Sequence, residues 1–332
     1  MLKSFTYPAM DAVRWYPGHM QRGLRNMQRH LPFVDCILEV HDARLPFTGR
    51  YERFEGALGV KPRILLLTKA DIACIDIKTQ NSISRHLKKK EGYYEVLFVN
   101  AAADKHPSMK KILPTVFDAI ESAPRYNRAH LAEQAIMVVG VPNVGKSSVI
   151  NVLRRVHMAR RKTAVAAVAN KPGVTRSLME KIKINEYPPV YLHDTPGILA
   201  ANVRTVHVGL LLAALDYTKC SLDDDIIADF VLNFLNEKAQ FHYVKHYGLS
   251  EVSCNVYQIL RKIALKHGFS RKIKDLHNQI KEGPDINVAA HRFLKDFRTG
   301  IIHKGMIDDI SKLELFSEME RKFIADFSDK IS

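Results

Sequence analysis

Short apolar runs alternate with amphipathic stretches over the first two hundred residues of the chain. Five β-rich runs, several ending in polar or turn residues, cover residues 36–41, 64–67, 96–99, 136–140 and 190–193. This alternation predicts βαβ units around a largely parallel sheet, with helices on both faces and ligands at the carboxyl ends of the strands. Beyond about residue 205 the apolar positions take helical spacing, over residues 223–238, 252–266 and 286–301. We therefore expect an α/β domain over residues 1–205 and a smaller, all-α C-terminal domain over residues 206–332.

The clearest chemical motif directly follows the apolar strand that ends at residue 139. Residues 140–147, GVPNVGKS, fit the G-x-x-x-x-G-K-[ST] pattern of a phosphate-binding P-loop, in its required place between a strand and a helix. Glycines allow backbone N–H groups to surround the phosphates, Lys146 supplies positive charge to the β- and γ-phosphates, and Ser147 offers a hydroxyl to magnesium. The motif predicts a nucleotide-binding protein.

Two further elements lie downstream of the P-loop. Asp194-Thr-Pro-Gly197 fits the D-x-x-G pattern, in which the acid holds magnesium through water and the glycine meets the γ-phosphate. Between this element and the P-loop, Thr175 is the candidate switch hydroxyl for magnesium in the triphosphate state. Taken alone, the first element is also an ordinary β-turn and the second an ordinary loop residue. Their order behind a P-loop indicates a nucleoside triphosphate site.

A guanine-reading element lies upstream of the P-loop. The run at 64–67 ends in Thr68-Lys69-Ala70-Asp71, close to the N-K-x-D pattern. The Asp71 carboxylate can accept hydrogen bonds from the ring N–H and the exocyclic amine of guanine, which adenine cannot supply, and Lys69 can lie along the base. Residues 100–102, NAA, occupy the place of a loop whose backbone N–H reaches the guanine carbonyl. Lys69 and Asp71 favour a GTPase over the rival class, a generic P-loop ATPase.

These motifs come in an unusual order: guanine reader, base loop, P-loop, switch threonine and D-T-P-G. This order resembles that of the circularly permuted GTPases. Trp15-Tyr-Pro-Gly-His19-Met20 resembles the W-x-P-G-H-M signature of the ribosome-biogenesis GTPase A-like family, and residues 289–300 resemble its terminal A-A-x-x-x-L-x-D-F-R-x-G element. The chain is most similar to the mitochondrial ribosome-associated members. The resemblance implies a P-loop GTPase domain with permuted motif order, followed by a helical domain.

The resemblance also implies a ligand set. The residues expected to bind GTP or GDP are Thr68, Lys69, Asp71, Asn100, Ala101, Ala102, Asn143, Val144, Gly145, Lys146, Ser147, Ser148, Thr175 and Gly197. Magnesium would be held by Ser147, Thr175 and Asp194, and the catalytic set would be His19, Thr175 and Gly197. Asn143 would help to hold an activating potassium ion, and an Asn after Pro142 is also typical of a simple turn.

Two residues depart from the usual GTPase pattern. Thr68 stands where the guanine reader usually has Asn, and one hydroxyl in place of an amide predicts weaker nucleotide binding while Asp71 still selects guanine. Ile198 stands where many small GTPases carry the glutamine that positions the attacking water. The resemblance therefore implies slow hydrolysis until another group takes over. His19 is the family's candidate for that role, and a histidine that only packs within its loop is the other interpretation.

The 332-residue chain is strongly basic, with 50 Lys and Arg against 35 Asp and Glu and a formal net charge of +15. Basic runs cover residues 22–29, 85–90, 154–162 and 261–274, and the helix predicted over 286–301 places Arg292, Lys295 and Arg298 opposite its apolar side. A single run is usually a solvated surface, but several on a GTPase scaffold favour structured RNA, bound through phosphates and shape. The resemblance supplies the partner: the large ribosomal subunit and its rRNA, in mitochondria, with no DNA.

The sequence leaves the cellular compartment to the resemblance. No apolar run approaches the length of a membrane span, and the four cysteines lie too far apart for a zinc site. Residues 1–14 lack a secretory apolar region and are too short and Pro-interrupted to identify a transit peptide, so they leave organelle import open. The family implies the mitochondrial matrix, and peripheral association with the inner membrane stays open. We expect a monomer.

Two functions are consistent with these observations. The first is a GTP-hydrolysing assembly factor for the mitochondrial large ribosomal subunit, with hydrolysis stimulated by that particle. Because the chain runs from Gly197 almost directly into the helical domain, a γ-phosphate-dependent change there can reach an RNA-binding surface. The alternative is a GTP-gated RNA-binding chaperone in which hydrolysis is incidental.

Overall fold

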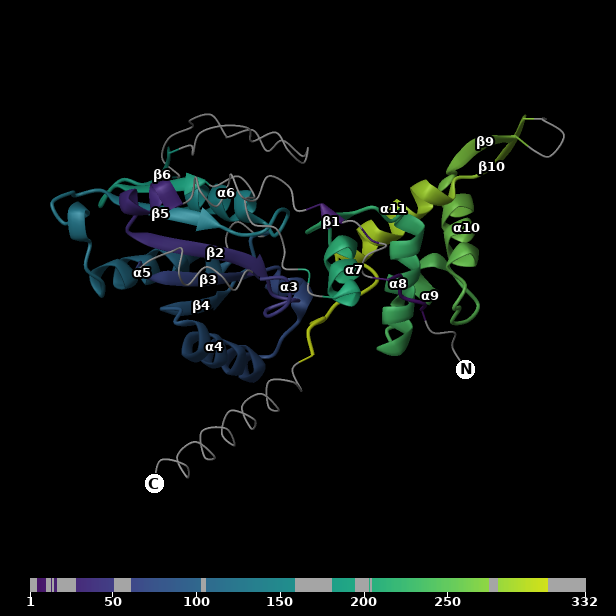
Figure 1. Cartoon of the computed structure of the whole chain (residues 1–332), viewed down its shortest axis with the longest axis horizontal. Coiled ribbons are helices and arrows are strands. Elements are labelled where there is room, and N and C mark those ends of the chain that lie inside the picture. Colours follow the sequence, from purple (N-terminus) through teal and green to yellow (C-terminus); the bar gives the residue numbers. More distant parts are fainter. Residues whose placement is uncertain are drawn as a thin grey trace, which may run out of the picture.

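The computed structural model describes residues 5–9, 13, 15–16, 28–50, 61–102, 106–158, 181–194, 203, 205–274 and 280–309. Its elements form two bodies that lie side by side (Figure 1). One is a sheet covered by helices, called here the sheet layer (β2–β7 with α3–α6), and the other is a helical bundle (α7–α11). The two bodies meet at the carboxyl ends of the sheet strands, where Lys69 and Asn143 contact the bundle.

The sheet layer contains six strands in the order β4-β3-β2-β5-β7-β6. Neighbouring strands are parallel except for β6, which pairs antiparallel with β7 at one edge. Because helices cover both faces, the central strands are buried throughout and read as continuous apolar runs. Each predicted run overlaps a strand, and β6 is the strand that the apolar pattern missed. The strands are β2 (Cys36–Asp42), β3 (Arg63–Thr68), β4 (Glu95–Phe98), β5 (Gln134–Val139), β6 (Lys181–Asn185) and β7 (Val190–Asp194).

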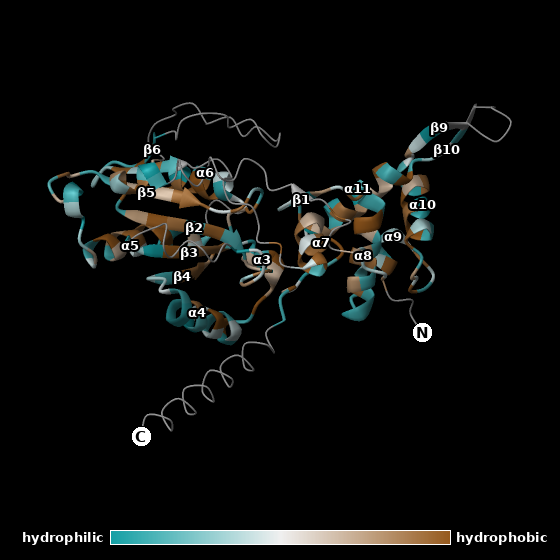
Figure 2. Cartoon of the chain, in the orientation of Figure 1, coloured by the Kyte–Doolittle hydropathy of each residue, from teal (hydrophilic) through white to brown (hydrophobic). Residues whose placement is uncertain are grey.

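Four helices of the sheet layer follow its strands: α3 (Ala70–Ala73), α4 (Ile77–Glu91), α5 (Pro107–Glu121) and α6 (Lys146–His157). Helix α4 begins where the Asp76 carboxylate accepts a hydrogen bond from the Thr79 N–H and ends at Gly92, whose φ of +65° is left-handed. Ile83 and Leu87 bury its apolar side, and its outer side is hydrophilic (Figure 2). Short 3-10 turns cover Leu31–Phe33 and Tyr126–Arg128.

The helical bundle consists of α7 (Val206–Ala214), α8 (Asp224–Glu237), α9 (His242–Tyr247), α10 (Val256–His267) and α11 (Ile286–Arg298). The three predicted helices correspond to α8, α10 and α11. The basic side predicted for α11 is largely wrong, because the Arg292 Nε bonds the Asp296 carboxylate and the Arg298 Nε donates to the Ala214 carbonyl. Of the three cations predicted on that side, Lys295 alone is exposed.

The C-terminal part is predominantly helical but differs from the all-α expectation. Strands β9 (Ser270–Lys274) and β10 (Ile280–Pro284) form an antiparallel hairpin that projects from the bundle (Figure 1). Gly268, with φ of +68°, ends α10 two residues before the hairpin and releases the chain from helical geometry. A second short pairing joins β8 (Lys219–Cys220) to β1 (Trp15–Tyr16), so the strand that opens the N-terminal signature is attached to the bundle.

The chain returns to the sheet layer after α11. The Gly305 N–H donates to the Ile72 carbonyl at 2.9 Å, and the Ile307 N–H donates to the Arg44 carbonyl at 2.8 Å. The Asp308 carboxylate accepts hydrogen bonds from the backbone N–H groups of Phe47 and Thr48. Residues 300–308 therefore connect the bundle to the sheet layer through hydrogen bonds beside α3, the helix that carries Asp71.

Candidate nucleotide site

The P-loop connects β5 to α6 and is shaped by two glycines with positive φ. A Cβ at Gly140, where φ is +152°, would lie 2.3 Å from the Val40 carbonyl oxygen of β2, so a side chain does not fit there. Gly145, with φ of +104°, occupies the position before the first residue of α6. The loop consequently approaches the neighbouring strand closely, and its end joins the helix N-terminus, the usual geometry for holding phosphate.

Lys146 begins α6 and is held by the loop itself. Its Nζ donates to the carbonyls of Gly140 at 2.9 Å and Val141 at 2.8 Å, and the residue is 8% exposed. Ser147 and Ser148 are exposed in the first turn of the helix. The ammonium, the two hydroxyls and the positive end of the α6 dipole therefore gather at one place, which fits a phosphate group and the cation that accompanies it.

Thr68 joins the guanine reader to the P-loop. Its Oγ1 lies 2.6 Å from the Val144 carbonyl oxygen and 2.9 Å from the His41 carbonyl oxygen, and the residue is 1% exposed. A hydroxyl has one proton to donate, so these buried carbonyls use it fully. Thr68 thus ties the two loops of the site together, and the selection of guanine stays a prediction for Asp71.

Asp71 and the base loop lie beside this tie. Asp71 is exposed in the first turn of α3, and the Ala70 N–H donates to the Val99 carbonyl, which joins the reader to the base loop. Within the base loop, the Asn100 N–H donates to the Ser108 hydroxyl and the Ala102 N–H to the Asn100 side chain. Because the other two N–H groups of this triplet are used within the loop, we expect the contact with a guanine carbonyl to come from Ala101.

Lys69 contacts a buried acid that the motifs did not indicate. Its Nζ lies 3.1 Å from the carboxylate of Asp42, the last residue of β2, and 2.6 Å from the Tyr217 hydroxyl of the bundle. Arg44 also pairs with Asp42, at 2.9 Å. Burial alone would raise the pKa of the Asp42 carboxyl, but the adjacent cations hold that pKa below its ordinary value. Asp42 is therefore a carboxylate shared between two cations.

The P-loop also contacts the bundle. Asn143, with φ of +61°, donates from Nδ2 to the backbone carbonyl of Asp216 at 2.8 Å and to its carboxylate at 2.9 Å. Both oxygens of Asp216 are acceptors, so the amide nitrogen of Asn143 faces Asp216 and the amide oxygen faces away from it. The turn-forming and ligand interpretations of Asn143 are both compatible with this geometry.

Several predicted site residues lie outside the described residues: His19, Thr175 and Gly197. The backbone of Asp194 ends β7 beside Val138 of β5, at the carboxyl edge that also carries the P-loop. Within the described ranges there is no group of three or more His, Cys, Asp and Glu residues that could hold a metal ion. The structure thus brings together the guanine reader, the base loop and the P-loop, and the magnesium set remains a prediction.

Four residues of the site were missed by the motif analysis: Asp42, Arg44, Asp216 and Tyr217. The predicted run 36–41 stops one residue short of Asp42, and the D-A-R sequence at the carboxyl end of a buried strand was a usable signal. Asp216 and Tyr217 had none, because they are distant in sequence from every motif they contact.

A P-loop tied to a guanine reader at the carboxyl edge of a mainly parallel sheet, with the reader first in sequence, is the arrangement of a circularly permuted P-loop GTPase. A family model described as 50S ribosome-binding GTPase matches residues 135–266. A solved structure, GNP-bound YlqF from T. maritima, superposes with a TM-score of 0.50 at 24% identity, covering 85% of this chain and 96% of that chain. This likeness supports the fold.

Relatives in sequence match almost the whole chain. Mitochondrial ribosome-associated GTPase 1 of Bos taurus is 42% identical over 315 residues, covering 92% of this chain and 91% of the relative. Ribosome biogenesis GTPase A of Bacillus licheniformis is 32% identical over 262 residues, covering 77% and 86%. The chain belongs to the mitochondrial ribosome-associated GTPase 1 family. The predicted family and the α/β P-loop GTPase fold are confirmed, and the chain is a GTPase that binds guanine nucleotides.

Proposed function

We propose that the chain is a GTP-hydrolysing assembly factor for the mitochondrial large ribosomal subunit. The observation that carries this proposal is the Thr68 hydrogen bond to the Val144 carbonyl, which joins a guanine-selective loop to a phosphate-binding loop. The printed names of the relatives, a ribosome-associated mitochondrial GTPase and a ribosome biogenesis GTPase, support the ribosome as the partner. The proposed site of action is the mitochondrial matrix, where the protein is monomeric and peripheral at the inner membrane. No helix within the described residues is long and apolar enough to cross a bilayer.

The proposed chemistry assigns one task to each residue of the site. Lys146 neutralises the β- and γ-phosphates, and Asp71 selects guanine. Magnesium, when bound to Ser147, Thr175 and Asp194, supplies charge stabilisation to the transferring phosphoryl group. Asn143 has its amide oxygen available for a potassium ion, because its nitrogen is engaged by Asp216.

Slow intrinsic turnover follows from Ile198, which cannot orient a water molecule. His19 is proposed to position that water once the ribosomal particle has bound, next to Thr175 and Gly197. The backbone pairing of β1 with β8 attaches to the bundle a strand that ends three residues before His19 in the sequence. A contact between the bundle and RNA can therefore affect the position of His19 through this pairing.

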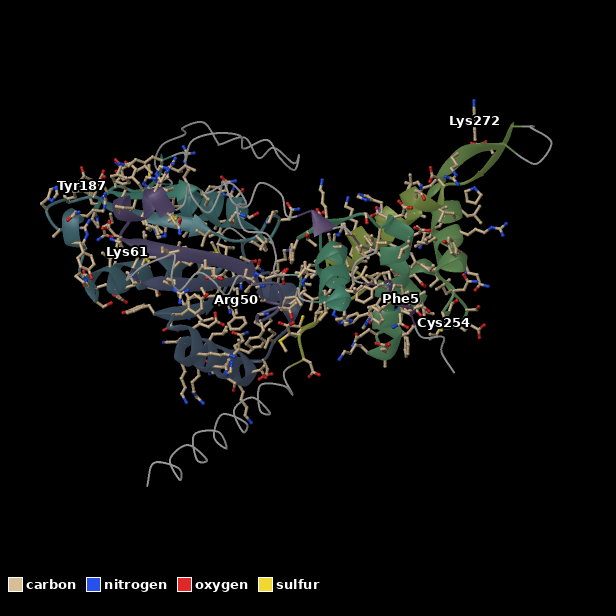
Figure 3. All side chains as sticks on the ribbon, in the orientation of Figure 1. Phe5, Arg50, Lys61, Tyr187, Cys254 and Lys272 are labelled. Atoms are coloured by element: carbon tan, nitrogen blue, oxygen red, sulfur yellow. The ribbon has the colours of Figure 1, made fainter. Side chains whose placement is uncertain are left out.

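Two exposed basic regions are proposed to contact rRNA. Arg271 and Lys272 lie on β9 of the projecting hairpin, and Lys272 points away from the rest of the chain (Figure 3). Lys89 and Lys90 are exposed in the last turn of α4, on the outer side of the sheet layer. A protruding ribbon and a helix end, both basic, suit phosphate contacts on a structured RNA.

Steady-state GTP hydrolysis tests the proposal. We expect slow turnover by the purified protein, faster turnover with potassium than with sodium, and a further increase with mitochondrial large subunits. Lys146→Ala should abolish nucleotide binding, whereas Lys181→Ala, which removes an exposed lysine paired with Glu133, should not. If neither potassium nor mitochondrial large subunits increase the rate of GTP hydrolysis, the proposal that the particle stimulates hydrolysis is refuted.

The alternative function, a GTP-gated chaperone, is distinguished from the assembly factor by whether hydrolysis-deficient variants stay bound to the subunit. If hydrolysis drives release, His19→Ala and Thr175→Ala variants that still bind GTP should accumulate on the subunit. If these variants leave the subunit as fast as the unmodified protein, hydrolysis is incidental and the chaperone alternative holds.

A further inference from the structure

The residues directly after α7 touch several parts of the nucleotide site. Asp216 accepts two hydrogen bonds from Asn143 of the P-loop, and Tyr217 contacts Lys69 of the guanine reader. Two residues later, β8 pairs with β1 of the N-terminal signature. A short segment of the bundle thus reaches three motifs that are far apart in the sequence, and none of the motifs predicts it.

The direction of the hydrogen bonds at Tyr217 is fixed by its partners. Its hydroxyl lies within hydrogen-bond distance of the Asp42 carboxylate, which can only accept, so the single hydroxyl proton goes to Asp42. The oxygen of the same hydroxyl then accepts from the Lys69 Nζ at 2.6 Å. Tyr217 is 2% exposed and Asp42 fully buried, so the hydrogen bond between these two groups is shielded from competing water.

This chain leaves Lys69 with capacity for a ligand. An ammonium has three N–H donors, and within the described part of the chain two of them are directed at Tyr217 and Asp42. The Lys69 side chain is 26% exposed, in contrast to the two groups that hold it. Asp71, the carboxylate expected to select guanine, follows Lys69 by two residues in the same motif, so the remaining donor is expected to meet a bound guanine nucleotide.

We propose that Tyr217 is a positioning residue for the guanine reader, supplied to it by the helical bundle. Tyr217 holds the Lys69 ammonium in the orientation that a bound guanine nucleotide requires, and Asp216 holds the P-loop in the same way through Asn143. The proposal rests on the GTP site proposed above. By linkage, nucleotide binding strengthens the docking of the bundle, and a partner that withdraws Tyr217 weakens nucleotide binding by the same factor.

Nucleotide affinity of the full chain tests this role. Tyr217→Phe removes one hydroxyl and keeps the ring, and we expect fluorescent GDP and GTP analogues to bind about fivefold more weakly, because one net hydrogen bond is lost. The preference for GTP over xanthosine triphosphate should not change, since Asp71 sets it. Tyr243→Phe is the matched control: its buried hydroxyl bonds Asn236 and Ser253, away from Lys69, and its loss should leave affinity unchanged.

A double-mutant cycle separates positioning from a general structural role. In a Lys69→Met background, Tyr217→Phe should cause no further loss of affinity, because the group it positions is gone. An equal loss with and without Lys69, or no loss in Tyr217→Phe alone, would overturn the proposal. If the unmodified chain binds no guanine nucleotide, the proposed function itself fails. This result differs from failure of the Tyr217 proposal, in which the unmodified chain still binds the nucleotide.

Hydrogen exchange gives a second measurement that does not depend on the tyrosine variant. GDP should slow amide exchange over residues 209–220 in the unmodified protein, because binding and docking are linked. Lys69→Met should reduce that protection at saturating GDP while leaving exchange in α10 unchanged, because only the Asn143–Asp216 link then remains. Protection of residues 209–220 that is undiminished in Lys69→Met would also overturn the proposal.

Discussion

Gly300 is the point at which the chain leaves α11 and turns back towards the guanine reader. Its φ is +79°, and an added Cβ would lie 2.8 Å from the Cγ2 atom of Ile72 and 3.4 Å from its Cγ1 atom. Ile72 follows Asp71 in α3, and the carbonyl of Ile72 accepts a hydrogen bond from the Gly305 N–H. A Gly300→Ala substitution therefore pushes directly on α3, the helix that carries Asp71, the carboxylate predicted to select guanine.

The expected cost has two parts. A left-handed backbone costs an alanine about 1 kcal/mol, and displacing Ile72 to relieve the close contact costs roughly 1–2 kcal/mol more. Gly268→Ala is a matched control, because Gly268 has φ of +68° and nothing within 4 Å of the added Cβ. We expect Gly300→Ala to lose about 2–3 kcal/mol of unfolding free energy and Gly268→Ala about 1 kcal/mol.

Urea denaturation and GDP binding measure the two consequences. Gly300→Ala should weaken GDP binding, and Gly268→Ala should not. In an Ile72→Ala background, Gly300→Ala should cost less unfolding free energy and less GDP affinity than it does in the unmodified chain, because the close contact is gone. Equal losses of stability in Gly300→Ala and Gly268→Ala, with GDP affinity unchanged in both, would refute the steric reasoning.

Three further predictions concern other residues. Thr68→Val removes the hydroxyl that ties the reader to the P-loop, so GDP affinity should fall about fivefold in a fluorescence titration, and unchanged affinity would contradict the tie. Burial lowers the pKa of His303 to about 4, below its ordinary 6.5, so stability should be lost as the pH falls from 6.5 towards 4. The loss at pH 5.5 relative to pH 7.5 should be about 1.4 kcal/mol smaller in His303→Phe, and an identical pH dependence by urea denaturation would exclude the histidine. Lys272→Glu should weaken rRNA binding and lower its salt dependence, whereas the exposed Lys238→Glu in the loop after α8 should change neither.

The sheet and the nucleotide loops were predictable because their signals are local. A strand buried on both faces leaves a continuous apolar run, and a P-loop needs its glycines and lysine at fixed spacing. The Gly140 contact with the Val40 carbonyl shows why that spacing is strict, since a side chain there would strike the neighbouring strand. Five strands and the three main helices of the bundle were accordingly placed from the sequence.

The remaining features depend on contacts between distant parts of the chain. Tyr217 lies 148 positions from Lys69, and no local pattern distinguishes it from any other buried tyrosine. The basic side predicted for α11 was wrong for the same reason, because a helical wheel cannot show that Arg298 meets the end of α7. The hairpin was missed because β9 is mostly basic and β10 ends in Gly283 and Pro284, which leaves no apolar alternation to read.

We propose above that GTP controls association of the chain with the mitochondrial large ribosomal subunit. Co-sedimentation of the purified protein with isolated mitochondrial large subunits tests it most directly, in the presence of a non-hydrolysable GTP analogue or of GDP, with Lys146→Ala and mitochondrial small subunits as controls. We predict that the protein sediments with large subunits in the presence of the GTP analogue, is released with GDP, and does not sediment as Lys146→Ala or with small subunits. Sedimentation that is the same with either nucleotide, or that persists in Lys146→Ala, would contradict the account.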